Sequence, residues 1–158
     1  MAVRTINILF VLLSLVLITT GSTSAYAQSR VEYEYDTSGL AVELAREALK
    51  DKTATFERAF GRKPVMSVAR VDLNNDGVPE IIARINEQMG FCDARGCDTY
   101  AFVVTRNGLI EIANIKTETL WVLKTATDNI RDLVATQFPR HEQAYLKWEK
   151  SRYKLAAY

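Results

Sequence analysis

The stretch Tyr100-Ala-Phe-Val-Val-Thr-Arg-Asn-Gly-Leu-Ile-Glu-Ile-Ala113 decides the fold class of this chain. It contains two β-rich runs on either side of Asn107-Gly108. Both residues of that pair tolerate the positive φ that a tight hairpin turn requires. The stretch therefore predicts an antiparallel β-hairpin in the middle of the chain.

Further strands are expected on both sides of this hairpin, because short β-rich or alternating runs are separated by polar turns. They are expected at 31–35, 65–73, 80–85, 120–123, 144–148 and 152–155. The segment 130–138 fits either a helix face or a strand, and the run from Asp132 to Thr136 favours the strand. The two segments at 144–148 and 152–155 predict a last hairpin around Glu149-Lys-Ser.

One long amphipathic helix is expected from Leu40 to Phe60, because its apolar residues fall on one stripe at helical spacing. That stripe consists of Val42, Ala45, Leu49, Phe56 and Phe60. Gly61 is placed to end the helix in a left-handed conformation, and Pro64 prevents its continuation. The sequence thus predicts an α+β domain in which one N-terminal amphipathic helix packs on a largely antiparallel β-meander sheet.

The first 27 residues have the pattern of a secretory signal peptide. Arg4 precedes an almost wholly apolar run from Ile6 to Ile18, and Ala25-Tyr-Ala27 is the small-x-small pattern that signal peptidases accept. We expect cleavage before Gln28, leaving 28–158 as a single domain in the periplasm or the medium. The alternative, an uncleaved anchor, is disfavoured because a spanning helix needs about 20 apolar residues. No later segment is long and apolar enough to span a membrane.

Charge disfavours two classes of partner. The whole chain has 20 basic and 19 acidic residues, and removal of 1–27 takes away only Arg4, which leaves 19 of each. A neutral domain without a basic run lacks the surface that neutralises nucleic-acid phosphates or anionic lipids. We therefore expect neither nucleic acid nor a membrane surface as a partner.

Cys92 and Cys97 are expected to form a local disulfide in an oxidising compartment. The chain-entropy estimate for so short a loop is roughly 2 kcal/mol of stabilisation. A redox-active pair would favour Cys-x-x-Cys spacing, and a zinc site would need two further ligands. Closed in this way, the loop with Asp93 and Arg95 would be a rigid projection suited to a partner's cleft. The alternative is an ordinary turn held by a disulfide.

The stretch from 72 to 80 has the spacing of a calcium loop. Side-chain oxygens occupy loop positions 1, 3, 5 and 9, Gly77 at position 6 permits a sharp bend, and a backbone carbonyl adds a further ligand. The expected ligands are Asp72, Asn74, Asp76, the carbonyl of Val78, and Glu80. Affinity would be weak, on the order of 0.1 to 1 mM. The alternative is a metal-free turn, because Asn, Asp and Gly also satisfy turn backbone groups.

The segment from Asp72 to Glu80 resembles the calcium loop of FG-GAP repeats in integrin-type propellers, where such a loop joins two strands. It departs from an EF-hand at position 12, where Ala83 replaces a bidentate glutamate. The resemblance covers about a dozen residues. The order of this loop, a short Cys-to-Cys loop, Arg131-Asp-Leu133 and an aromatic hairpin from Trp148 to Tyr153 is also similar to small bacterial envelope proteins of uncharacterised function, which implies export but no activity.

These features favour a non-catalytic exported binding module that presents the disulfide loop to a protein of the cell envelope. In this hypothesis the calcium loop stabilises the hairpin that presents the disulfide loop. One alternative is an inhibitor or immunity-type protein that blocks an envelope hydrolase. Another is a metal-dependent hydrolase that uses Asp72, Asp76 and Glu80. His141, the only histidine, lies in a polar connection and is expected to be exposed rather than catalytic.

Overall fold

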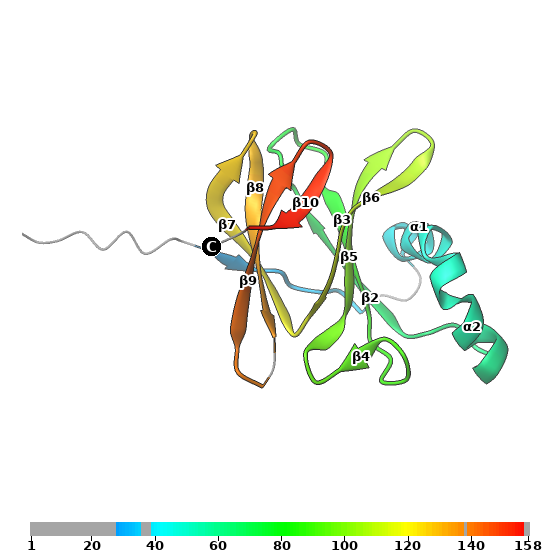
Figure 1. The fold of residues 1–158 in the computed structure, drawn as a ribbon. Helices are drawn as coiled ribbons and strands as arrows, with labels where there is room; N and C mark the ends of the chain where they lie inside the picture. Colours follow the sequence, from blue (N-terminus) through cyan, green and yellow to red (C-terminus); the bar gives the residue numbers. More distant parts are fainter. Residues whose placement is uncertain (1–27, 36–38, 138, 157–158) are drawn as a thin grey trace, which may run out of the picture.

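The computed structural model describes residues 28–35, 39–137 and 139–156 (Figure 1). The predicted signal peptide, 1–27, lies outside these residues. Within the part of the chain that is described, no helix is long and apolar enough to cross a membrane.

The described residues form two antiparallel sheets and two short helices. Sheet A contains, in spatial order, β1 (Ser29–Arg30), β7 (Thr119–Thr127), β8 (Ile130–Gln137), β9 (Glu142–Glu149) and β10 (Arg152–Leu155). Sheet B contains β2 (Met66–Val71), β3 (Glu80–Ile85), β5 (Gly96–Thr105) and β4 (Cys92–Asp93), with β6 (Gly108–Thr117) paired to β5. The prediction of an α+β protein is thus confirmed in outline, but two sheets replace the single predicted meander.

Sheet B is the middle layer of three, between sheet A and the helices (Figure 1). Its strands alternate between two hydrophobic clusters, as the period of two in a strand requires. In β3, Ile82 belongs to the cluster shared with sheet A, whereas Ile81, Ala83 and Ile85 belong to the cluster shared with the helices. The central sheet is therefore buried on both faces.

The predicted helix is interrupted. It forms α1 (Leu40–Ala48) and α2 (Lys50–Phe60), separated at Leu49, where the backbone leaves the helical region with φ −104° and ψ 5°. Leu49 itself is fully buried. Gly61 ends α2 with a φ of 65°, as predicted.

The change of direction at Leu49 alters the predicted apolar stripe. Helix α1 packs across β2, β3 and β6, and α2 extends away from the sheet (Figure 1). Phe60, at the far end of α2, therefore remains 46% exposed, with its ring centroid 4.6 Å from that of Phe56. The prediction that Phe60 joins the buried stripe is wrong.

The segment predicted as a strand from Val31 to Tyr35 instead crosses between the two sheets. Before it, β1 pairs with β7 of sheet A, and within it Glu34 forms an isolated bridge to Val68 of β2 in sheet B. Val31 is buried between the sheets, 3% exposed. The alternation therefore marks a crossing segment and not a regular strand.

Both predicted hairpins and the strand at 130–138 agree with the structure over the described residues. β8 covers Ile130–Gln137, and β9 and β10 form the last hairpin. β5 and β6 form the central one, in which Thr105 pairs with Gly108. Its turn differs in detail, because Gly108, with φ 115°, takes the positive φ and Asn107 does not.

Candidate binding loop and cation loop

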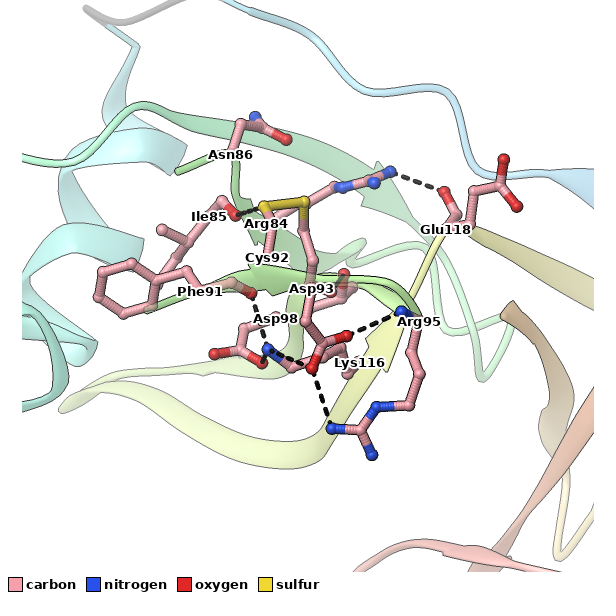
Figure 2. Close-up of a disulfide and its surroundings, with 12 residues drawn as sticks. Arg84, Ile85, Asn86, Phe91, Cys92, Asp93, Arg95, Asp98, Lys116 and Glu118 are labelled. Atoms are coloured by element: carbon pink, nitrogen blue, oxygen red, sulfur yellow. Dashed lines mark hydrogen bonds and ion pairs between the residues drawn. A yellow bond between two sulfur atoms is a disulfide. The ribbon is translucent and has the colours of Figure 1, made fainter. Parts of the chain in front are cut away.

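The disulfide between Cys92 and Cys97 is formed, with an S–S distance of 2.06 Å. The two cysteines are directly opposite each other in a narrow hairpin made by β4 and the start of β5. Asp93 pairs with Gly96, which leaves Ala94 and Arg95 at the tip. Figure 2 shows this hairpin, called here the disulfide hairpin (Cys92–Cys97), and its surroundings.

The tip of the disulfide hairpin is ordered by contacts between its own residues. The Arg95 backbone N–H donates to Asp93 at 2.8 Å, and its guanidinium donates to the same carboxylate at 3.0 Å. These bonds hold the pKa of Asp93 below its usual value, and the bond from the Arg95 side chain contributes most to this effect. The Arg95 side chain is still 61% exposed, so the tip offers a positioned cation to solvent.

Lys116 on β6 ties the hairpin to the sheet. Its ammonium donates to the carbonyl of Phe91 at 3.0 Å and lies 3.1 Å from Asp98 and 3.6 Å from Asp93 (Figure 2). The Lys116 side chain is only 18% exposed. A partly buried cation with three oxygen partners restrains the hairpin more than an exposed ion pair does.

Glu87 holds the chain that leads into the hairpin. Its carboxylate accepts two bonds from the Arg62 guanidinium, at 2.6 and 3.1 Å, and one from the backbone N–H of Val65 at 2.8 Å. Its carbonyl accepts the N–H of Cys92 at 2.9 Å. The bond from Arg62 is the main cause that lowers the pKa of Glu87. Residue 87 therefore joins the end of α2 to the disulfide hairpin.

Gly96 permits the close approach of the hairpin to β6. Its φ is 122°, and a Cβ placed there would lie 2.1 Å from the carbonyl carbon of Thr117. Only glycine fits this position, because the obstructing atoms belong to backbone.

The predicted calcium loop joins β2 to β3. Its side chains accept hydrogen bonds from the loop's own backbone: Asp72 from Gly77 at 3.1 Å, Asn74 from Asp76 at 3.0 Å, and Asp76 from Val78 at 2.7 Å. These are the bonds expected of a metal-free turn, and they also bring the side-chain oxygens together within one loop.

Two observations in the loop are consistent with binding of a cation that prefers oxygen ligands. Asp72 Oδ1 is buried and forms no hydrogen bond in the described part of the chain. Glu80 is only 4% exposed, and it accepts the N–H of Leu73 at 2.7 Å. Burial raises the pKa of Glu80, and the charges of Asp76 and Asp72 add to this effect. A divalent cation would reduce the repulsion between these carboxylates and would give Asp72 Oδ1 a partner.

Carboxylates alone do not complete a metal site here. Among the described residues, no three His, Cys, Asp or Glu side chains are grouped closely enough to hold a metal. A cation in this loop therefore needs the Asn74 side chain and the Val78 carbonyl in addition to carboxylates. This donor set suits calcium, which takes amide and backbone oxygens readily.

The loop and the disulfide hairpin lie at opposite ends of β3. The predicted calcium loop (72–80) ends at Glu80, the first residue of β3, and the disulfide hairpin follows the last residue of β3, Ile85. If the loop stabilises the hairpin that presents the disulfide, the effect must therefore pass along β3, and this hypothesis stays a prediction. Arg131 of β8 contacts the predicted calcium loop. Its guanidinium donates to the Asn75 side chain at 2.6 Å, and its backbone N–H donates to the Leu73 carbonyl at 2.8 Å.

His141 has a 70% exposed side chain whose Nδ1 lies 3.7 Å from the Glu118 carboxylate. The expectation that it is exposed is confirmed.

Comparison with protein-family models, with curated proteins and with solved structures found no match to the chain.

Sequence reasoning found the two cysteines and the tip but missed the residues that hold them. Glu87, Arg62 and Lys116 are isolated charges without a local pattern, and 25 residues separate Glu87 from Arg62. Gly96, directly before Cys97, is the one signal in the sequence that the chain makes a close approach there.

Proposed function

We propose that this chain is an exported, non-catalytic binding module that presents the disulfide hairpin to a protein of the cell envelope. The observation that carries the proposal is the way the hairpin is held. The disulfide closes it, Lys116 and Gly96 fix it to β6, and Glu87 fixes its approach, while the tip at Ala94 and Arg95 is exposed. A loop restrained before binding loses little entropy when it binds.

Inhibition of an envelope hydrolase is the second candidate, and the same rigidity favours it. A restrained loop with an exposed guanidinium suits a cleft that carries carboxylates, such as a hydrolase active site. The two candidates differ in outcome, because an inhibitor abolishes the activity of the captured protein whereas a simple binding module leaves it intact.

Calcium belongs to the proposal as a stabilising ion in the loop from Asp72 to Glu80. The buried, unsatisfied Asp72 Oδ1 and the buried Glu80 support this role. Export supplies both the millimolar calcium that a weak site needs and the oxidising conditions that the disulfide needs. A hydrolytic role is less well supported, because Asp72 and Asp76 already accept backbone N–H groups of their own loop.

The test is site-specific photo-crosslinking in the envelope of the producing cells. A photoreactive residue at Ala94 is expected to give one protein adduct, and competition by unlabelled protein should remove it. The same residue at Arg106, in the distant β5–β6 turn, is the matched control and should give no such adduct. Replacing both cysteines by alanine should weaken the Ala94 adduct. Equal labelling from both positions, or an adduct indifferent to competition, would contradict the proposal.

A further inference from the structure

A second candidate site lies on the face of sheet A that is turned away from sheet B. A hollow of about 400 Å³ is present there, near the lower end of the range of about 300 to 1,000 Å³ that ligand sites occupy. The residues that line it are Gln28, Leu123, Thr125, Asp132, Tyr145 and Lys147.

Strand alternation assigns this hollow to the outer face. Val122, Leu133 and Leu146 belong to the cluster between the two sheets. Their chain neighbours Leu123, Asp132 and Tyr145 therefore point to the opposite face, because successive side chains of a strand alternate. Three adjacent strands, β7, β8 and β9, thus supply the walls.

Asp132 is the unusual residue in this hollow. It is 4% exposed, and its carboxylate accepts one bond from the Thr127 hydroxyl, at 2.7 Å. Among the ion pairs of the described residues, none includes Asp132, although Lys147 lines the same hollow. Burying a carboxylate without a cation costs free energy, which a cationic ligand would recover.

We propose that this hollow binds an alkylammonium group, with the ammonium at Asp132 and the alkyl stem against Leu123 and Tyr145. The apolar walls can pack against the alkyl stem, and the buried carboxylate of Asp132 favours a positively charged group. Lys147, exposed at the rim, opposes any cation that enters. The source of the group is either a free amine or the side chain of a lysine in a protein. This site is independent of the disulfide hairpin and does not rest on the function proposed for it.

The test compares n-hexylammonium with 1-hexanol, which has the same stem but no charge. Both are titrated into the exported protein at pH 7, and binding is followed by NMR shifts of β7, β8 and β9. We expect n-hexylammonium to bind at least about tenfold more tightly than 1-hexanol, as a charge-assisted contact predicts. Nα-acetyl-lysine methylamide, as a third probe, shows whether a lysine side chain also fits. Equal affinity for the two hexyl probes would overturn the proposal.

Three variants test the assigned residues. Asp132→Asn keeps the size of the side chain and should remove the preference for charge. Lys147→Gln should tighten n-hexylammonium severalfold, because a like charge is removed. Glu149→Gln is the matched control, since Glu149 is an exposed carboxylate on the same strand, 3.1 Å from Lys154, and it should leave binding unchanged. An unaltered preference in Asp132→Asn contradicts the proposal.

A variant that leaves Asp132 intact keeps the proposal testable if Asp132→Asn fails to fold. Thr125→Trp fills the hollow from an exposed strand position, where an aromatic residue is well tolerated. It should abolish binding of both hexyl probes. A folded Thr125→Trp protein that still binds n-hexylammonium with wild-type affinity would show that the ligand lies elsewhere.

Discussion

At Gly96 the neighbouring backbone leaves no room for a side chain. Gly96→Ala should lower the free energy of unfolding by about 3 kcal/mol or more, because Thr117 cannot move aside without disturbing β6. Gly108→Ala is the matched control: its φ is 115°, but nothing lies within 4 Å of the added Cβ, and we expect a loss of about 1 kcal/mol. Urea unfolding measures both. Equal losses would show that the close approach to β6 is not what constrains the hairpin.

Glu87 gives the protein a pH dependence whose sign can be stated. Because its folded pKa lies below the usual value of 4.5, its contribution is present above that value and is lost as the pH falls through the folded pKa. Glu87→Gln should therefore cost about 1 kcal/mol at pH 7 and progressively less below pH 4.5. Urea unfolding of both proteins across this range measures the difference.

The control for this prediction is Glu47→Gln, which removes an exposed carboxylate paired with Lys50 on the helices. It should change stability little at any pH. A wild-type advantage over Glu87→Gln that stays constant down to pH 3 would show that the interaction with Arg62 does not depend on the charge of Glu87.

The β2–β3 loop is the element for which the metal and metal-free interpretations give different results. With a dissociation constant of about 1 mM, 10 mM calcium should stabilise the fold by about 1.4 kcal/mol and raise Tm by roughly 5 °C. Asp72→Asn should remove this response. Asp51→Asn, at an exposed position in the first turn of α2, should retain it. The absence of both heat and a thermal shift at 10 mM calcium would favour the metal-free turn.

Elements were predictable where their signal is local. The central hairpin, the last hairpin and the turn between β2 and β3 each depend on residues within a few positions of one another, and all three lie where the sequence placed them. The break at Leu49 was not predictable, because Leu49 fits the helical stripe and is buried in the structure as that stripe requires. Its backbone conformation is not evident from the residue type.

The three-layer arrangement is a property of the whole molecule that local patterns did not contain. Alternation in β3 is masked because both faces are buried, so Ile81-Ile-Ala-Arg-Ile85 is almost continuously apolar. The crossing of the chain near Glu34 from one sheet to the other depends on pairing with β7 and β2, which are distant in sequence. A single sheet was therefore the simplest prediction.

The polar groups at the candidate sites were likewise predictable only where their partners are close in sequence. The disulfide was predictable because its two cysteines are close in sequence and no others exist. The buried Asp132 and the ion pair of Glu87 with Arg62 were not, because their surroundings are assembled by strands and helices from different parts of the chain.

The most direct test of the account is the intact mass of the protein isolated from producing cells after immediate alkylation of free thiols. Export, processing and oxidation together predict a chain that begins at Gln28, lies in the envelope or the medium, and carries no alkyl group on Cys92 or Cys97. A full-length chain within the cell that carries two alkyl groups would contradict the account.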